Sequence, residues 1–471
     1  ALIKLAEDRH YWFVCAHHLA ADGWSLDRLF RALAEAYTAL ARGERVALAA
    51  PSYAEFIDAD LAYRGSAQFA QDRAYWMAKY ADLPEPLLLP REREGRAEPA
   101  AATGELRWRL DPALGAGIDA LAGRYRSTRF QVVLAAFYAF LMRLEQREEV
   151  VIGLSVLNRK SARLRSIAGM FTNVMAARLR FDRGGSFAAM LEALAAMLRR
   201  DYRHQRFPIG ELNRSLQLFE RQRAQLYEAS MSYEHGGGGL YFDQAPASVV
   251  KCTNDIEGTP LRLCMRDDLH GGEAAMHFIY GRRYFDEAGI AVLQRRFDGF
   301  LQALLANPEQ PIAALPILTP EEQRQLAAWN ATAAPYPQDV CVHELFERQA
   351  ERTPQATALV HAGGELAYAE LNAQANRLAH RLLALGLRPD ARVALCVERS
   401  AAMIVAVLAI LKAGGAYLPL DPGYPAERLA YALDDAQPAL LLLDAAGRRA
   451  LGARAQAPAV LDLDADAAQW R

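Results

Sequence analysis

The sequence predicts an α/β protein with more than one domain. The chain has 471 residues, and a single hydrophobic core rarely serves that many. Short runs with the two-residue alternation of strands are interleaved with longer runs of helical periodicity. Proline is dense between about residues 307 and 337, and this density breaks regular structure and suits a linker between domains.

The first part of the chain predicts a strand, a sharp turn and then helices. Residues 10–16 alternate as a strand does, and residues 24–42 have the pattern of an amphipathic helix. A second helical stretch runs from about 53 to 80. Residues 87–100 are rich in proline and charge, which indicates a crossover between two lobes.

A second lobe is expected from Gly104 onward. Ser127 or Thr128 can serve as the N-cap of its longest helix. The glycine run 236–239 is interpreted as a flexible loop and not as a phosphate site. The expected strands cover residues 105–110, 150–156, 173–181, 229–233, 261–265 and 275–280, and the expected helices cover residues 112–125, 127–144, 187–203 and 288–305.

Beyond the linker, strands and helices alternate, which predicts a doubly wound sheet with right-handed crossovers. Gly386 stops one helix as its C′ residue. Gly414-Gly415 ends another, and we interpret this pair as a helix C-cap because anion sites lie at helix N-termini. A leucine stripe is assigned to the core, namely Leu371, Leu378, Leu382 and Leu385. The expected elements cover residues 321–329, 370–385, 392–397, 401–412, 416–420, 426–434 and 439–443.

Composition excludes several classes of protein. The formal net charge of −2 argues against a nucleic-acid binder. The five cysteines are scattered, which argues against a disulfide framework or a metal site and favours a reducing, cytoplasmic setting. The longest apolar run, residues 401–411, is too short to span a membrane. No signal peptide opens the chain, and its start at Ala1 is interpreted as a cut from a longer protein.

The strongest chemical signal is the heptad His17-His18-Leu19-Ala20-Ala21-Asp22-Gly23. It lies between the first predicted strand and the first predicted helix. A histidine at a strand end beside a tight turn presents its imidazole at an edge, where a general base can reach a substrate. Asp22 is a poor direct partner for His18, because three residues and a turn separate the two.

This heptad, with Trp24-Ser25, resembles the core motif of condensation domains from nonribosomal peptide synthetases. Further stretches are similar to that family's motifs and follow in its order. They are Tyr53-Ala54-Glu55-Phe56, Ile167-Ala168-Gly169-Met170-Phe171-Thr172-Asn173 and His204-Gln205-Arg206-Phe207-Pro208, the last of which departs from the family pattern at Ile209-Gly210.

The last third resembles the start of an adenylation domain. Leu366-Ala367-Tyr368-Ala369-Glu370-Leu371 is similar to its first motif, and residues 411–422 match its second. The sequence holds no stretch like the phosphate loop Thr-Ser-Gly-x-Thr-Gly-x-Pro-Lys-Gly. ATP and Mg²⁺ are therefore expected only for a complete adenylation domain, and this chain is expected to bind no cofactor or metal itself.

The resemblance implies a fold and a domain layout. The expected fold is α/β, with a chloramphenicol-acetyltransferase-like condensation domain and then the start of an adenylate-forming domain. Residues 1–95 would end an incomplete first lobe, 96–315 would form the second lobe, 316–340 the linker, and 341–471 the start of the adenylation domain.

The implied reaction is amide formation in the biosynthesis of a secondary metabolite such as a peptide antibiotic. Two acyl groups would be held as thioesters on the 4′-phosphopantetheine arms of upstream and downstream peptidyl carrier domains. Those domains and the rest of the synthetase are the expected partners, with no nucleic acid and no membrane. The amino acids joined cannot be named from the sequence.

The resemblance assigns roles within the motif. His18 is the expected catalytic residue, and His17 is expected to pack. Asp22 would pair with an arginine that holds the turn, and that arginine is expected upstream of Ala1, which would leave Asp22 without its partner. Gly23 would serve a sharp turn or a positive φ. Asn173 would line the channel opposite His18 or act as a structural amide.

Two rival functions remain open. An epimerisation domain shares the double histidine, although direct continuation into an adenylation domain argues against it. A heterocyclisation domain is disfavoured, because it would carry an aspartate where His17 stands. The second rival is a catalytically inactive fragment that serves only for docking within the same synthetase.

Overall fold

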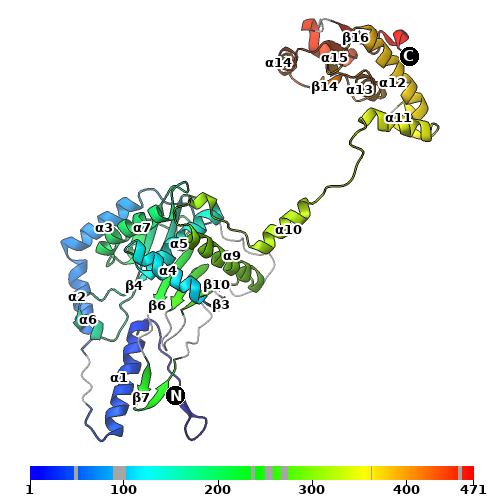
Figure 1. The fold of residues 1–471 in the computed structure, drawn as a ribbon. Coiled ribbons are helices and arrows are strands. Elements are labelled where there is room, and N and C mark those ends of the chain that lie inside the picture. The colour runs from blue at the N-terminus through cyan, green and yellow to red at the C-terminus, as the bar shows by residue number, and fades with distance from the viewer. Residues whose placement is uncertain are drawn as a thin grey trace. The chain divides into compact units, whose positions relative to one another are not determined.

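The computed structural model describes residues 1–46, 51–87, 102–234, 239–249, 258–266, 274–361, 363–454 and 459–470. The chain divides into two compact units, Ala1–Ala331 and Thr332–Arg471 (Figure 1). This division falls within residues 316–340, the region predicted to be a linker. Most of the predicted crossover and most of the glycine run 236–239 lie outside the described residues.

The first unit opens with a short hairpin and three helices. These elements are β1 (Leu2–Lys4), β2 (His10–Trp12), α1 (Gly23–Ala41), α2 (Ala54–Arg64) and α3 (Ala67–Lys79). The strand predicted over residues 10–16 ends early, at Trp12. The single helical stretch predicted over residues 53–80 is in fact two helices, because Ser66 caps α3 by accepting a hydrogen bond from the Phe69 N–H.

A six-stranded mixed sheet forms the centre of the first unit. Its order is β3-β10-β9-β6-β4-β5, in which β4, β6 and β9 are parallel neighbours and the other pairs are antiparallel. The strands are β3 (Thr103–Arg109), β4 (Glu149–Val156), β5 (Asn173–Arg180), β6 (Ala229–Glu234), β9 (Leu261–Arg266) and β10 (Ala275–Gly281). All six were predicted within a few residues.

Helices and the sheet share one large hydrophobic core. Helix α5 lies at its centre, and every residue from Val132 to Met142 is buried. Thr128 and Gln131 form a capping box that starts this helix. Of the two predicted N-caps, Ser127 and Thr128, the structure therefore confirms Thr128. The main helices are α4 (Pro112–Arg124), α5 (Arg129–Glu145), α7 (Phe187–Asp201) and α9 (Glu287–Ala306).

Shorter elements complete the first unit. They are α6 (Ala162–Ser166), α8 (Ile209–Ser215), β7 (Leu240–Phe242), β8 (Ala245–Ala247) and α10 (Pro320–Asn330), with two 3₁₀ turns, Tyr202–His204 and Ile312–Ala314. Helix α10 is held on α9 by an ion pair between Glu322 and Arg296 at 2.6 Å. The first part of the predicted linker therefore forms a regular helix, as predicted for residues 321–329, although none of its residues is buried.

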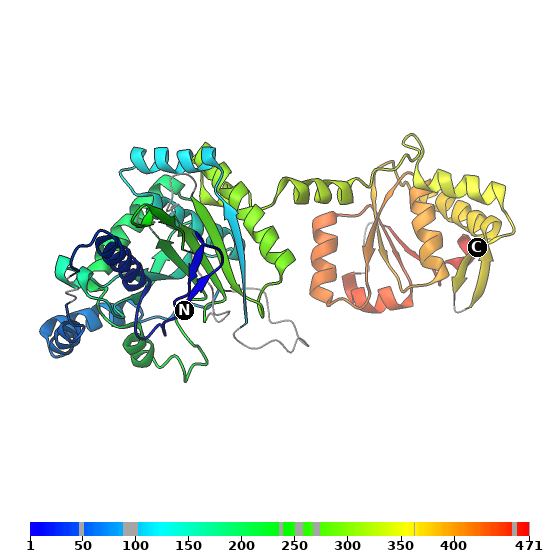
Figure 2. The same cartoon turned by 90° about the horizontal axis from the view of Figure 1, so that it is seen from below.

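The second unit is built on a four-stranded parallel sheet of order β14-β13-β15-β16, as the alternating pattern predicted. Helices α12 and α13 cover one face, and α14 and α15 cover the other (Figure 2). Its elements are α11 (Val342–Arg352), β11 (Thr357–His361), β12 (Gly364–Ala367), α12 (Tyr368–Ala384), β13 (Arg392–Cys396), α13 (Ala401–Lys412), β14 (Ala416–Leu420), α14 (Ala426–Ala436), β15 (Leu440–Leu443), α15 (Ala445–Leu451) and β16 (Val460–Asp462). Five of these elements, namely α11, β11, β12, α15 and β16, were not predicted from the sequence.

The glycine pair after α13 ends that helix as predicted. Gly414 has φ +77, and its N–H donates to the Leu411 carbonyl at 3.0 Å. The Gly415 N–H donates to the Ile410 carbonyl at 2.8 Å, which completes a Schellman motif. Among the described residues, no helix is both long enough and apolar enough to cross a membrane.

Candidate active site

The double-histidine turn connects β2 to α1, and both imidazoles are exposed. The Nδ1 atom of His17 accepts a hydrogen bond from the Leu19 N–H at 3.1 Å. His17 is exposed among the described residues, so a packing role for it stays a prediction. The exposure of His18 agrees with a group that must meet a substrate.

Asp22 fixes the end of this turn. Its carboxylate is 1% exposed and caps α1 by accepting the Ser25 N–H at 2.9 Å. It also accepts the Ser25 Oγ–H at 2.7 Å and the backbone N–H of Phe171 at 3.1 Å. Asp22 makes no contact with His18, as the spacing predicted, so its role is to anchor the turn to the loop before β5.

Arg159 is the partner of Asp22, and its position corrects the expectation drawn from the sequence. Its Nη2 atom lies 3.0 and 3.1 Å from the two carboxylate oxygens of Asp22, and its side chain is fully buried. The arginine was expected upstream of the chain, whereas it lies 137 residues downstream, just after β4. Arg159 follows the carboxyl end of β4 and therefore lies at the end of the sheet that contacts the double-histidine turn. A polar Asn158-Arg159-Lys160 run directly after a buried strand was the signal that could have revealed it.

The Asp22–Arg159 pair belongs to a larger buried cluster, which we call the turn anchor: Asp22, Ser25, Arg159, Gly169 and Phe171. Arg159 also donates to the carbonyls of Leu164 and Ile167, and its guanidinium lies 3.7 Å from the centre of the Phe171 ring. Ser25 Oγ accepts the Gly169 N–H at 2.9 Å. Every polar side chain of the cluster is therefore held by several partners.

The charge balance of the turn anchor favours an ionised Asp22. Burial alone raises the pKa of this carboxyl. Hydrogen bonds from Ser25 and from the Phe171 N–H, together with the positive charge of Arg159, outweigh burial and hold the pKa of Asp22 below its ordinary value. The salt bridge therefore persists at neutral pH.

The predicted motif Tyr53-Ala54-Glu55-Phe56 packs directly against the predicted motif of residues 167–173. The Tyr53 hydroxyl donates to the Met170 carbonyl at 2.6 Å, and its ring lies against Gly169. A Cβ atom at Gly169 would lie 2.1 Å from Tyr53 Cδ2, and Gly169 has φ +155, so only glycine fits this position. Glu55 pairs with Arg163 of α6 at 2.6 Å. Both motifs therefore support the turn.

Gly23 and Asn173 are placed differently from some expectations. Gly23 is the first residue of α1 and has no positive φ, so the positive-φ alternative for this residue is wrong. The Asn173 amide donates to the carbonyls of Gln205 and Phe207, both at 2.9 Å. These bonds link β5 to the predicted motif of residues 204–208. These contacts are those of a structural amide, and a channel-lining role for Asn173 stays a prediction.

The whole first unit matches one family. Residues 1–327 match the condensation domain family. The chain belongs to this family. Residues 346–470 match the AMP-binding enzyme family, so the condensation domain is followed by the start of an AMP-binding domain.

The similar curated proteins are large peptide synthetases. Tyrocidine synthase 3 of Brevibacillus parabrevis is 32% identical over 443 residues, which are 94% of this chain and 7% of that protein. Malpinin synthetase of Mortierella alpina is 32% identical over 462 residues, 96% of this chain and 6% of the relative. This condensation-domain chain therefore spans only a small part of the relatives that it matches.

Solved structures agree on the fold. The first condensation domain of the calcium-dependent antibiotic synthetase, in complex with a substrate analogue, is 26% identical with a TM-score of 0.57. That match covers 64% of this chain and 66% of the other. A four-domain nonribosomal peptide synthetase bound to AMP and glycine gives a TM-score of 0.74 at 22% identity, covering 97% of this chain and 36% of that one.

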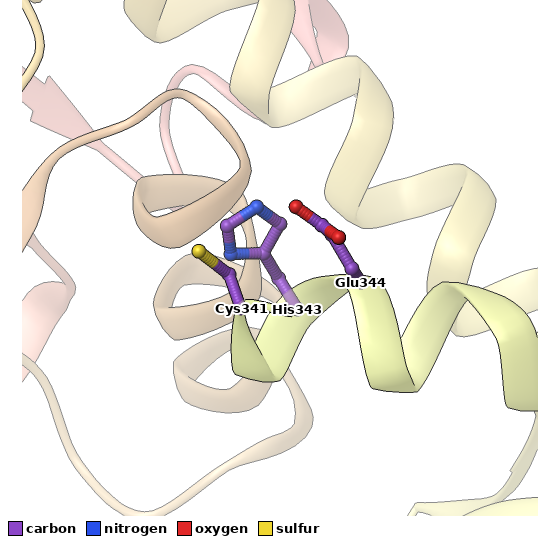
Figure 3. Close-up of side chains that lie close together, drawn as sticks. All are labelled: Cys341, His343 and Glu344. Atoms are coloured by element: carbon purple, nitrogen blue, oxygen red, sulfur yellow. The ribbon is translucent and has the colours of Figure 1, made fainter. Parts of the chain in front are cut away.

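One side-chain cluster of the second unit has the residue types of a metal site. Cys341, His343 and Glu344 bring their ligand atoms within 4.8 Å of one another at the start of α11 (Figure 3). All three lie at the N-terminus of one helix, and the partial positive charge there disfavours a bound cation. Cys341 is also exposed to solvent. We assign this cluster no role.

Proposed function

We propose that the condensation domain of this chain forms an amide bond between two carrier-bound acyl groups, with His18 as its catalytic residue. The observation that carries the proposal is the exposed imidazole of His18 on a turn whose end is fixed by the turn anchor through Asp22 and Arg159. Membership of the condensation domain family supports the same reaction. The activity of the longer proteins that it resembles is part of this proposal.

The chemistry requires one base and precise positioning. The acceptor amine attacks the donor thioester carbonyl, so that a C–N bond forms and the carbonyl becomes a tetrahedral oxyanion. His18 takes the proton that the attacking nitrogen must lose. The C–S bond then breaks, and the departing thiolate takes up a proton to become the free thiol of the donor arm. Histidine is the side chain that most often serves in such a proton transfer.

The larger setting follows from the same proposal. The substrates would be carried by 4′-phosphopantetheine arms of neighbouring carrier domains, and ATP-dependent amino-acid activation would belong to the complete AMP-binding domain. The AMP-binding match over residues 346–470 supports this organisation. We propose a cytoplasmic setting, because the cysteines of the described residues are free thiols.

A docking module without catalysis is the second candidate, and one experiment separates the two. Two purified carrier domains would be loaded with a donor and an acceptor aminoacyl group, and the dipeptide would be measured by mass spectrometry. His18→Ala should reduce the rate by about 10²- to 10⁴-fold, as the loss of a general base does. His17→Ala is the matched control, because its Nδ1 only supports the local turn.

Folding must be checked in the same variants. Both imidazoles are exposed, so His18→Ala and His17→Ala should unfold at the same urea concentration as the parent. Unchanged product formation by a folded His18→Ala variant would leave the docking module as the better assignment.

A further inference from the structure

The central sheet of the first unit has one apolar face and one polar face. On β6, β9 and β10, one set of alternating side chains enters the hydrophobic core. The other set is unusually polar for the interior strands of a sheet, and it includes Ser232, Cys264 and His277. Cys264 and His277 are only 8% and 5% exposed. Polar groups buried this deeply need partners or a function.

These three side chains form one row across neighbouring strands. Ser232 is directly opposite Cys264, and Cys264 is directly opposite His277 in the strand register. Ser232 Oγ and Cys264 Sγ lie 3.0 Å apart. Burial raises the pKa of the Cys264 thiol, so this sulfur stays protonated and is a poor nucleophile. The row is therefore better suited to binding than to covalent chemistry.

A carboxylate orients the imidazole at the end of this row. The Nδ1 atom of His277 lies 2.8 Å from a carboxylate oxygen of Glu105 on β3. Burial lowers the pKa of His277. The pKa of Glu105 also lies below its ordinary value, because hydrogen bonds from Arg107 and His277 outweigh the effect of burial. At neutral pH the imidazole is therefore neutral, and Nδ1–H donates to the Glu105 carboxylate.

This tautomer leaves one lone pair to offer. The Nε2 atom of His277 is then a hydrogen-bond acceptor, and it has no partner among the residues that the structure describes. A nearly buried imidazole that is held by a carboxylate, and whose Nε2 has no partner among the described residues, can receive a donor from another molecule.

The row lies close to the edge at which the catalytic turn docks. Strands β4, β6 and β9 are parallel, so their carboxyl ends share one edge, and antiparallel β10 begins at that edge. Arg159 and the rest of the turn anchor leave the sheet at this edge, after β4. In open sheets, ligands bind beyond the carboxyl ends of parallel strands.

We propose that Ser232, Cys264 and His277 form a substrate subsite in which His277 Nε2 accepts a hydrogen bond from the acyl group being joined. This subsite rests on the proposed function and deepens it, because it selects a class of substrate. The favoured class is an aminoacyl or peptidyl group with a donor on its side chain, such as a hydroxyl or an amide N–H. Glu105 is a positioning residue that sets the tautomer of His277.

Binding tests this subsite independently of catalysis. The probes are non-hydrolysable amide analogues of seryl-, asparaginyl- and alanyl-N-acetylcysteamine, titrated calorimetrically into the full chain. One neutral hydrogen bond predicts that the seryl and asparaginyl probes bind about fivefold more tightly than the alanyl probe. His277→Phe keeps a ring but removes the acceptor, so it should bring this preference close to one.

Two further variants complete the test. Glu105→Gln removes the charge that fixes Nδ1–H, and its amide can face Nδ1 with either its oxygen or its NH₂ group, so it should weaken the preference. Ile279→Val, on the same face of β10, is the matched control and should leave the preference unchanged. Equal binding of all probes by the parent chain, or a preference that survives in folded His277→Phe, would overturn the subsite. A preserved binding preference without dipeptide product would instead count against the proposed function alone.

Discussion

Removal of the Arg159 side chain is the sharpest test of how the catalytic turn is held. Arg159 and Asp22 have side chains that are at most 1% exposed and lie 3.0 Å apart. Breaking a buried ion pair by removing one partner costs about 3–5 kcal/mol, because the other charge stays buried without compensation. The carboxylate keeps the N–H groups of Ser25 and Phe171, so we expect Arg159→Met to lose about 3 kcal/mol, at the low end of this range.

A double-mutant cycle and a matched control make this prediction specific. Asp22→Asn combined with Arg159→Met removes both charges, so its loss should be smaller than the sum of the single losses by about 1–3 kcal/mol. Arg163→Met is the control, because its pair with Glu55 lies on the same loop but is exposed to solvent. That variant should lose less than about 1 kcal/mol.

Urea unfolding of the first unit can be measured by tryptophan fluorescence, because every tryptophan except Trp470 lies in that unit. The pH dependence has a definite sign. The pKa of Asp22 is lowered in the folded chain, so its stabilisation is present above the unfolded value of 3.8 and is lost as pH falls through the lowered folded pKa. In Arg159→Met, Asp22 keeps the hydrogen bonds from Ser25 and Phe171 but loses the positive charge of Arg159, so its pKa should be lowered less than in the parent. The difference in unfolding free energy between parent and variant should therefore narrow on acidification.

Two results would refute this reasoning. If Arg159→Met lowered the free energy of unfolding by less than about 1 kcal/mol, the Asp22–Arg159 pair would stabilise the chain no more than a surface ion pair does. Strict additivity in the cycle would show that Asp22 and Arg159 do not act on each other.

Three other residues, Gly169, Asp298 and Glu322, offer further predictions. Gly169→Ala should destabilise the first unit by roughly 2–3 kcal/mol, because the new Cβ would clash with the Tyr53 ring. Gly23→Ala is the control and should change the free energy of unfolding by less than about 0.5 kcal/mol, because nothing lies within 4 Å of its Cβ position. Urea titration of both variants measures the difference. Burial raises the pKa of Asp298 to about 6, so the parent should gain stability as pH falls from 8 towards 5. Asp298→Asn should lack this gain and should be more stable by about 1 kcal/mol at pH 8, after allowance for solvent screening. The Arg296 hydrogen bond lowers the pKa of Glu322 to about 2, so Glu322 stabilises α10 above pH 4.5 and loses this effect as pH falls towards 2. Glu322→Ala should therefore speed hydrogen exchange in α10 at neutral pH, and an unchanged rate would contradict the capping role.

The sequence predicted elements best where local pattern and caps agree. Helix α13 and strand β14 were predicted at their observed bounds, because apolar periodicity, a terminal glycine pair and the following strand all point to the same boundaries. Helix α11 was missed, although its pattern is amphipathic, because it follows directly on the proline-rich stretch that was interpreted as linker. The break between α2 and α3 was also missed, since a single serine cap at residue 66 decides it.

The candidate site shows the same division between local and distant information. The turn with His17, His18 and Asp22 is contiguous in sequence, so its motif could be recognised directly. Its arginine could not be, because the sheet order brings residue 159 to the turn from 137 positions away. The dyad of Glu105 and His277 is equally hidden, since its residues are 172 positions apart and meet only through strand pairing.

Residue order alone was enough to establish the family, the alternation of strands and helices, and the residue that we expect to accept a proton. Each of these depends on residues that are neighbours in the chain or on patterns of short period. The folded chain was needed to show which charge balances Asp22, why Gly169 must be glycine, and which polar side chains share one face of the sheet. Those answers depend on strand order and register, because residues far apart in sequence meet only after the sheet has assembled.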